Sequence, residues 1–335
     1  MDLFELTRRL IDIESITGNE KEAGEFLFTH LAELAGRHQG QAERMEVEPS
    51  RFNVFAHWGN PAVTLSTHID TVPPHIPSRE DEDRIWGRGA CDAKGILASM
   101  VCAAAELLEE GVRDFGLLFV VGEEKNSAGA REAARRPRGS RFLINGEPSG
   151  NQLALGSKGA LRYEIAARGK MAHSAYPELG ESAIDKLLDV LQDLRAMQQP
   201  VDPLLGPGTL NIGTVSGGRA SNVVPDRASA EVMIRLVGDP EPVRRAVIRT
   251  VAGRAEAQEV LCIPAVRLDS LPGIPTTVVA YTSDIPAFGG VWGKPFLLGP
   301  GSIHVAHTLE EHAPKRQLAE AVQIYKGMVK QLLAT

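Results

Sequence analysis

Histidine and acidic side chains follow several short apolar runs along this chain. One pair stands after AVTL, a second after LLFVVG, a single glutamate after FLING and a histidine after FLLGPGSIHVA. In chain order these residues are His68 with Asp70, Glu123 with Glu124, Glu147, and His307. Imidazole nitrogens and carboxylate oxygens are ligands for divalent transition metals, so the residue types first indicate a metal site.

The apolar runs predict the scaffold that positions these side chains. Segments 62–67, 115–121 and 141–145 are continuously apolar, as strands covered on both faces are. Between the first two, residues 95–111 have helical apolar spacing, with Gly111 as the C-terminal stop. This alternation predicts an α/β fold with a mostly parallel sheet.

Loops at the carboxyl ends of parallel strands meet in one crevice, so these residues should be neighbours in space. Asp92, in the glycine-rich WGRGACDAKG before a helix, is expected on the same rim. Five carboxylates sharing one cleft repel one another unless a cation neutralises them. The set exceeds the needs of one tetrahedral ion, so we expect two ions of zinc, cobalt, manganese or iron, with Asp70 orienting the His68 imidazole.

Each residue alone also has an ordinary structural explanation. A His-x-Asp pair such as His68 and Asp70 occurs in surface turns, paired glutamates occur at solvated strand ends, and Asp92 could cap the following helix. Their joint occurrence, each after an apolar strand and in one order, favours the metal site.

The composition limits the other classes of function. The 335 residues include 36 basic and 43 acidic side chains, a net charge of −7, which indicates a soluble acidic protein of about two domains. No basic run is longer than ARRPR, so nucleic acid is not an expected partner. No apolar run reaches the roughly 18 residues of a membrane span. Three scattered cysteines argue against a disulfide framework and favour the cytoplasm.

Two helices are expected before the first strand. Residues 3–13 have apolar side chains at helical spacing with charges between them, unlike a signal peptide. Asn19 followed by Glu22 predicts a capping-box helix with Asn19 as its N-cap.

The pattern changes near residue 160. Segments 161–169 and 228–238 alternate apolar and polar residues, as strands with one solvated face do. Helical stretches at 181–197 and 241–257 lie among them. This set predicts a small α+β sandwich with helices on one face.

The buried pattern returns after this region, in a strand at 294–301 and a last helix at 316–333. The simplest organisation is one domain inserted into another. We predict a catalytic domain of residues 1–159 and 266–335 and an inserted domain of residues 160–265.

Five motifs then match a known family in order and spacing. HIDTVP, GRGACDAKG, GEEKNSAGA, NGEPSG and GPGSIHVAHTLEE resemble the zinc amidohydrolase and metallopeptidase family of acetylornithine deacetylase, succinyl-diaminopimelate desuccinylase and aminoacylase. The resemblance covers nearly the whole chain. It implies a mostly parallel-sheet zinc-hydrolase domain with an inserted ferredoxin-like lid and dimerisation domain, a homodimer, and two zinc ions per chain, replaceable by Co²⁺ or Mn²⁺.

The resemblance also implies a role for each site residue. The implied ligands are His68 and Glu147 on one ion, Glu124 and His307 on the other, and Asp92 between them. Glu123 would be the general base and Asp70 would orient His68. The peptide bond after Asp92 is often cis in this family.

Three further residues match lid or substrate segments of the family. His173, in KMAHSAYPELGESA, would reach a neighbouring active site and hold the substrate carbonyl oxygen, although a histidine here could also cap the following turn. Asn222, in GGRASNVVPDRA, would contact substrate or belong to an ordinary loop. Asp284, in YTSDIPAF, resembles the substrate-side loop of amino-acid deacylases.

The implied reaction is hydrolysis of the amide bond of an N-acyl amino acid, as in acetylornithine deacetylase. Lys158, Arg162, Arg219 and Arg235 could each pair with a substrate carboxylate, although exposed basic side chains are more often only solvated. A dipeptidase or aminopeptidase of the same family is the alternative within this chemistry.

Other classes fit the sequence less well. A non-catalytic zinc-binding protein on this scaffold could lack the general base, but both glutamates of GEE are present. A two-metal phosphoesterase would also gather carboxylates and histidines. No G-x-S-x-G or G-x-x-x-x-G-K-[ST] occurs, which argues against a serine hydrolase and a P-loop nucleotide site.

Overall fold

The chain forms two compact units in a computed structural model that describes residues 1–335. The first unit consists of residues 1–155, 268–277 and 283–335, and the second of residues 156–267 and 278–282. The chain therefore enters the second unit twice, the second time only for residues 278–282, a short excursion that the sequence pattern does not predict.

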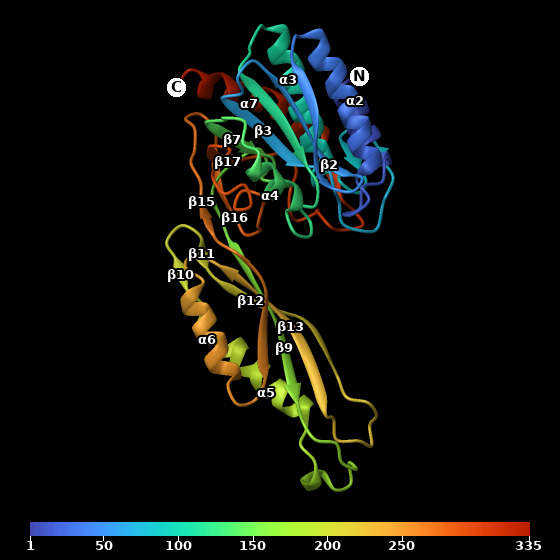
Figure 1. The fold of residues 1–335 in the computed structure, drawn as a ribbon, viewed down its shortest axis with the longest axis vertical. Coiled ribbons are helices and arrows are strands. Elements are labelled where there is room, and N and C mark those ends of the chain that lie inside the picture. The colour runs from blue at the N-terminus through green and yellow to red at the C-terminus, as the bar shows by residue number, and fades with distance from the viewer. The chain divides into compact units, whose positions relative to one another are not determined.

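The first unit is built on a six-stranded sheet in the order β1-β2-β6-β3-β7-β17 (Figure 1). Its strands are β1 (Gln41–Glu48), β2 (Arg51–Trp58), β3 (Val63–His68), β6 (Phe115–Val120), β7 (Phe142–Asn145) and β17 (Lys294–Leu297). β6, β3, β7 and β17 are parallel, whereas β1 and β2 form an antiparallel hairpin at one edge. This mainly parallel sheet confirms the predicted α/β fold class.

Helices cover the sheet because successive side chains of each strand point to opposite faces. The helices of this unit are α1 (Leu3–Asp12), α2 (Lys21–Arg37), α3 (Lys94–Glu109), α4 (Ala128–Arg135) and α7 (Lys315–Leu333). Leu117 and Phe119 of β6 pack into a core with α2, α3 and α7, while Leu118 and Val120 pack toward α4 and Trp292. A smaller sheet pairs β18 (His312–Pro314), β5 (Arg84–Trp86) and β4 (Arg79–Glu80).

The second unit contains an antiparallel sheet in the order β12-β13-β9-β14. Its main elements in chain order are β9 (Gly159–Arg168), α5 (Ala183–Ala196), β12 (Thr209–Gly217), β13 (Arg227–Leu236), α6 (Glu241–Val251) and β14 (Glu256–Ile263). One sheet face packs on α5 and α6, as the alternating sequences of β9 and β13 predict. The order strand, helix, two strands, helix, strand is that of the ferredoxin-like fold.

Short elements complete the chain. They are the 3-10 turn Pro177–Leu179, β10 (Val201–Asp202), β11 (Gly206–Pro207), β8 (Leu153–Ser157), β15 (Val266–Arg267) and β16 (Thr276–Val279). No helix is both long enough and apolar enough to cross a membrane.

Two helix boundaries differ from the sequence-based expectation. The cap predicted at Asn19 is wrong: α2 begins at Lys21, with Glu20 at the cap position, and the Asn19 amide instead donates to Glu14 at 2.7 Å. Glu20 bonds the Gly18 N–H and Arg51, so the carboxylate fixes the turn before the helix. The helix predicted over 241–257 ends at Val251, because residues 256–263 join the sheet as β14.

Candidate metal centre

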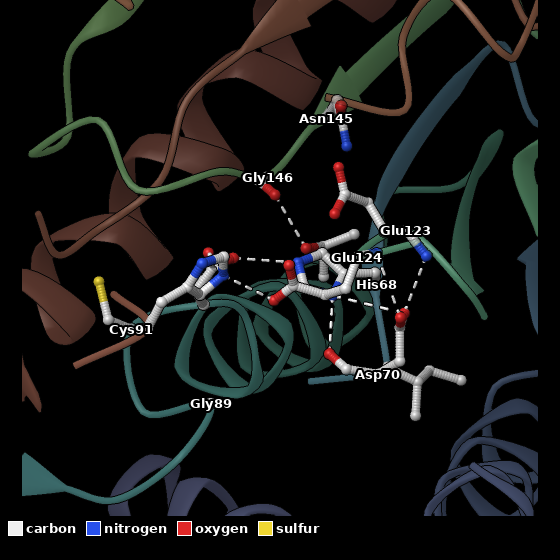
Figure 2. A network of polar contacts seen from close by, with 12 residues as sticks. His68, Asp70, Gly89, Cys91, Glu123, Glu124, Asn145 and Gly146 are labelled. Atoms are coloured by element: carbon white, nitrogen blue, oxygen red, sulfur yellow. Dashed lines mark hydrogen bonds and ion pairs between the residues drawn. The ribbon is translucent and has the colours of Figure 1, made fainter. Parts of the chain in front are cut away.

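The parallel strands deliver the candidate ligands to one edge of the first unit's sheet. His68 is the last residue of β3, and Glu123 and Glu124 follow β6 (Figure 2). Glu147 follows β7. His307 lies in the long segment after β17, and Asp92 precedes α3. All six residues belong to the first unit.

The side chains form two groups that share Asp92. The groups are His68, Asp92 and Glu147, and Asp92, Glu124 and His307; within each, the ligand atoms lie within 4.8 Å of one another. One Asp92 oxygen lies 3.0 Å from His68 Nε2, and the other lies 3.5 Å from His307 Nε2. His307 Nε2 also lies 2.9 Å from Glu124 Oε1.

The environment of these atoms fits metal ligation. Glu147 is 3 % exposed, and its buried Oε1 has no hydrogen-bond partner. A buried carboxylate oxygen without a donor needs a cation or a proton. The donors are imidazole nitrogens and carboxylate oxygens, while the nearby Cys91 thiol is directed to the Ser302 carbonyl oxygen at 3.3 Å. This donor set suits two zinc-like ions with Asp92 between them.

Asp70 holds both sides of this centre. His68 Nδ1 lies 2.9 Å from the Asp70 carbonyl oxygen, closer than the 3.6 Å to its carboxylate. That carboxylate instead accepts the backbone N–H groups of Gly122, Glu123 and Glu124 at 2.9, 3.1 and 3.2 Å. Asp70 therefore contacts His68 through its main-chain oxygen and the Glu123–Glu124 turn through its carboxylate (Figure 2).

Burial and mutual repulsion shift the pKa values of the acidic residues. Burial raises the pKa of Glu123 well above its usual value, and the neighbouring Glu147 carboxylate adds to this. Burial likewise raises the pKa of Glu147, with Asp92 as the main charged contributor. Asp92 differs: burial alone would raise its pKa, but contacts with His307 and His68 lower it.

The histidines respond in the opposite direction. The Asp92 and Glu124 carboxylates raise the pKa of His307 to about 10. Burial alone would lower the pKa of His68, but its contacts with Asp70 and Asp92 raise it well above the usual value. In the absence of a metal, imidazolium groups thus offset part of the negative charge.

Asp284 adds another buried carboxyl group to the first unit. Its side chain is 1 % exposed, and its Oδ1 has no hydrogen-bond partner. Burial raises the pKa of Asp284 to about 7, although Ser127 donates a hydrogen bond to it. Asp284 in turn contributes to the raised pKa values of Glu123 and Glu147.

The remaining predicted residues lie in the second unit. His173 is exposed, and its Nδ1 accepts the Ala175 N–H at 3.1 Å, the turn-capping contact considered from the sequence. Asn222 is exposed, and its carbonyl oxygen accepts the Ser174 N–H. Lys158 donates to the Pro207 carbonyl oxygen at 2.7 Å. Arg219 pairs with Asp226 through two hydrogen bonds, from Nε to Oδ1 and from Nη2 to Oδ2, each 2.9 Å long.

Three residues that contact the ligand loops were missed from the sequence. Thr17 donates to the Asp70 carboxylate at 2.8 Å. Glu311 accepts main-chain N–H groups around Asp92 and pairs with the buried Arg88. Of the three, only Glu311 had a signal in the sequence: it is the second glutamate of the HTLEE motif, four residues after His307.

Known sequences and structures place this arrangement in a family. The sequence model of peptidase family M20/M25/M40 matches residues 64–331, so the chain belongs to that family. It is 40 % identical to a peptidase M20 domain-containing protein of Schizosaccharomyces pombe, over 98 % of this chain and 84 % of that protein. It is 38 % identical to a probable carboxypeptidase of Aspergillus terreus, over 96 % of this chain and 84 % of the relative.

The fold is also similar to that of solved structures. An M20 family metallo-carboxypeptidase of Sulfolobus solfataricus superposes with a TM-score of 0.80 at 17 % identity, with each chain fully covered. This likeness supports the fold class, with a mainly parallel sheet in one unit.

We expect removal of the Asp284 charge to change the pH dependence of stability in the metal-free protein. The pKa of Asp284 is higher in the folded protein than in the unfolded chain, so ionisation of Asp284 disfavours the folded state. Below about pH 4 the group is protonated in both states and costs no stability; as the pH rises toward 7, the folded protein loses stability. Asp284→Asn should gain over the wild type about 1.5 kcal/mol at pH 5, rising to about 4 kcal/mol at pH 7. Urea unfolding of both proteins in the presence of a chelator, repeated between pH 5 and pH 7, measures the free energies of unfolding.

The matched control is Asp269→Asn, at an exposed carboxylate that pairs with Lys294. Its free energy of unfolding should follow the wild-type pH profile. Equal pH profiles for Asp284→Asn and the wild type would contradict the assigned burial effect.

Proposed function

We propose that this chain is a metal-dependent hydrolase that cleaves the amide bond on the acyl side of an amino acid with a free carboxylate. The observation that carries the proposal is the pair of ligand groups sharing Asp92, with Glu123 beside them. The relatives named as carboxypeptidases support the carboxylate requirement. The class includes both a C-terminal peptide residue and an N-acyl amino acid of the acetylornithine type.

The proposed cofactor is a pair of zinc ions, with Co²⁺ or Mn²⁺ as substitutes. His68 and Glu147 would hold one ion, Glu124 and His307 the other, and Asp92 would contact both. When bound, the ions would polarise the scissile carbonyl group and lower the pKa of the attacking water.

Glu123 is the proposed general base. It accepts a proton from the water that attacks the amide carbon and then delivers that proton to the departing amine nitrogen. Burial raises the pKa of Glu123 above that of an exposed glutamate, the direction that favours proton uptake from the water. The Asp70 carboxylate accepts the Glu123 N–H and so fixes the main chain of Glu123.

Replacement of Glu123 by Gln should abolish most turnover while leaving metal binding intact. The amide has nearly the same shape but cannot accept the proton, so kcat should fall about 100- to 10,000-fold. Turnover of the best substrate and metal content per chain are measured together. Asp269→Asn, exposed and outside the centre, is the control. Full activity of Glu123→Gln would contradict its assignment as the base.

Arg235 is the proposed partner of the substrate carboxylate. Arg219 is already paired with Asp226 and Lys158 with a carbonyl oxygen, whereas neither Arg162 nor Arg235 forms an ion pair. Burial lowers the pKa of Arg235 with no acidic group to oppose the effect. A partly buried guanidinium without a counter-ion is suited to an incoming carboxylate.

The substrate class is tested with matched acids and amides. The panel contains N-acetyl, N-succinyl and N-formyl amino acids and dipeptides, each with a free or an amidated C-terminus, with zinc, cobalt or chelator. We expect metal-dependent cleavage of the acids. Arg235→Met should lower kcat/KM for acids about 10- to 100-fold, the loss expected for a hydrogen bond to a charged group. The control Arg219→Met should change it little.

The outcomes separate the alternatives. Cleavage of acetylated amino acids, acetylornithine among them, would favour the deacylase, and cleavage only of peptides would favour a carboxypeptidase or dipeptidase. Equal cleavage of acids and amides would contradict the carboxylate requirement. Metal binding with no cleavage across the panel would favour a non-catalytic protein on this scaffold.

We also propose that the second unit is a lid and dimerisation domain that supplies His173 to a partner's active site and Asn222 to the substrate. The support is the family resemblance, the exposure of His173 and the open edge of β12, whose residues are mostly exposed. An unpaired strand edge is a template for a second chain. The proposed location is the cytoplasm, in keeping with three free cysteines.

Subunit mixing tests the assignment of His173. Glu123→Gln and His173→Ala should each be nearly inactive alone, yet co-refolded they should recover about a quarter of wild-type activity, because half of the dimers carry one intact composite site. Sedimentation of each variant reports the dimer. A strict monomer, or mixtures no more active than the separate variants, would contradict the exchange of His173 between subunits.

A further inference from the structure

Glu311 has an unusual set of hydrogen-bond partners for a residue outside the ligand groups. Its side chain is 1 % exposed. Its Oε1 accepts the main-chain N–H groups of Gly89 at 2.9 Å, Asp92 at 3.2 Å and Cys91 at 3.3 Å. One carboxylate oxygen thus gathers three amides from the segment that ends at Asp92.

The other oxygen of Glu311 faces a buried cation. Arg88 Nη1 lies 2.5 Å from Glu311 Oε2, and the Arg88 side chain is 2 % exposed. Arg88 Nε donates to the Pro74 carbonyl oxygen at 3.2 Å. In addition, the Gly87 N–H donates to the main-chain oxygen of Glu311 at 3.1 Å. Side chain and main chain of Glu311 together hold residues 87–92.

This segment needs such a support because it has no strand ladder. It belongs to neither β5, which ends at Trp86, nor α3, which begins at Lys94. Gly89 has a φ of +89°, and an added Cβ would lie 2.9 Å from Lys94 and 3.0 Å from Thr71. The turn is therefore close to its neighbours, and the N–H groups of Gly89, Cys91 and Asp92 take Glu311 as their acceptor.

We propose that Glu311 is a positioning residue that fixes Asp92 between the two ligand groups. The inference rests on the proposed function in so far as Asp92 is taken as the shared metal ligand. Glu311 is four residues from His307, whose Nε2 lies 3.5 Å from Asp92 Oδ2. The segment that supplies His307 thereby also sets the position of Asp92.

A purely structural ion pair with Arg88 is the competing explanation, and Glu311→Gln separates the two. Glutamine keeps the shape, but its NH₂ group must face either the three amides or Arg88, which are all donors. The matched control is Glu310→Gln, one residue away, whose side chain is 78 % exposed and contacts only Arg79. If Glu311→Gln does not fold, Glu311→Asp keeps the charge opposite Arg88 but is too short to gather all three amides.

Two measurements are made on each variant of the full chain. In metal-free protein, amide hydrogen exchange of peptides covering 87–97 reports the clamp directly. Calorimetric titration with Zn²⁺ reports the affinity and number of bound ions. We expect Glu311→Gln to exchange at least about tenfold faster in this segment alone and to bind at least one ion at least about tenfold more weakly. Glu310→Gln should match the wild type in both.

Each outcome decides between the explanations. Unchanged exchange, or faster exchange with Zn²⁺ affinity within about twofold of the wild type, would overturn the positioning role. If the wild type itself binds no Zn²⁺, the metal proposal fails, while the exchange result still tests the clamp. Where Glu311→Asp replaces Glu311→Gln, the same two readouts apply.

Discussion

The first unit depends on buried negative charge collected at one edge of its sheet. Glu123, Glu124 and Glu147 converge there because the parallel strands β6 and β7 end at the same edge, and Asp92 joins them from the segment before α3. Burial opposes ionisation, and proximity adds mutual repulsion. His68 and His307 offset part of the charge as imidazolium ions, but the same nitrogens serve as metal ligands only when neutral. Cations therefore satisfy this group more completely than protons can.

Much of the first unit could be predicted because burial on both faces leaves a direct record in the sequence. β3, β6 and β7 are continuously apolar, and their ends locate His68, Glu123 and Glu147. The hairpin of β1 and β2 was missed, since β1 reads QAERMEVE and only Met45 is fully buried on that edge strand. The local preference of Asn19 for the N-cap position did not set the start of α2, because the tertiary ion pair of Glu20 with Arg51 fixes Glu20 at that position.

The supporting contacts were harder to predict because their partners are main-chain groups. Glu311 accepts main-chain amides about 220 residues away in the chain, and Asp70 accepts those of Gly122, Glu123 and Glu124 more than 50 residues away. Neither the residue type of a donor nor its spacing records such a contact, since nearly every residue offers the same N–H. Only the folded arrangement brings these donors to the two carboxylates.

Hydrogen-bond saturation distinguishes two kinds of acidic residue in this centre. The carboxylates of Asp70 and Glu311 each receive four donors, three of them main-chain N–H groups, and so hold loops that have no ladder of their own. Glu147 is equally buried, yet its Oε1 receives none. An ionised carboxylate only accepts, so an acid surrounded by N–H groups has its electrostatic needs met by the protein. An acid left without donors at the same depth has its oxygen free for a cation.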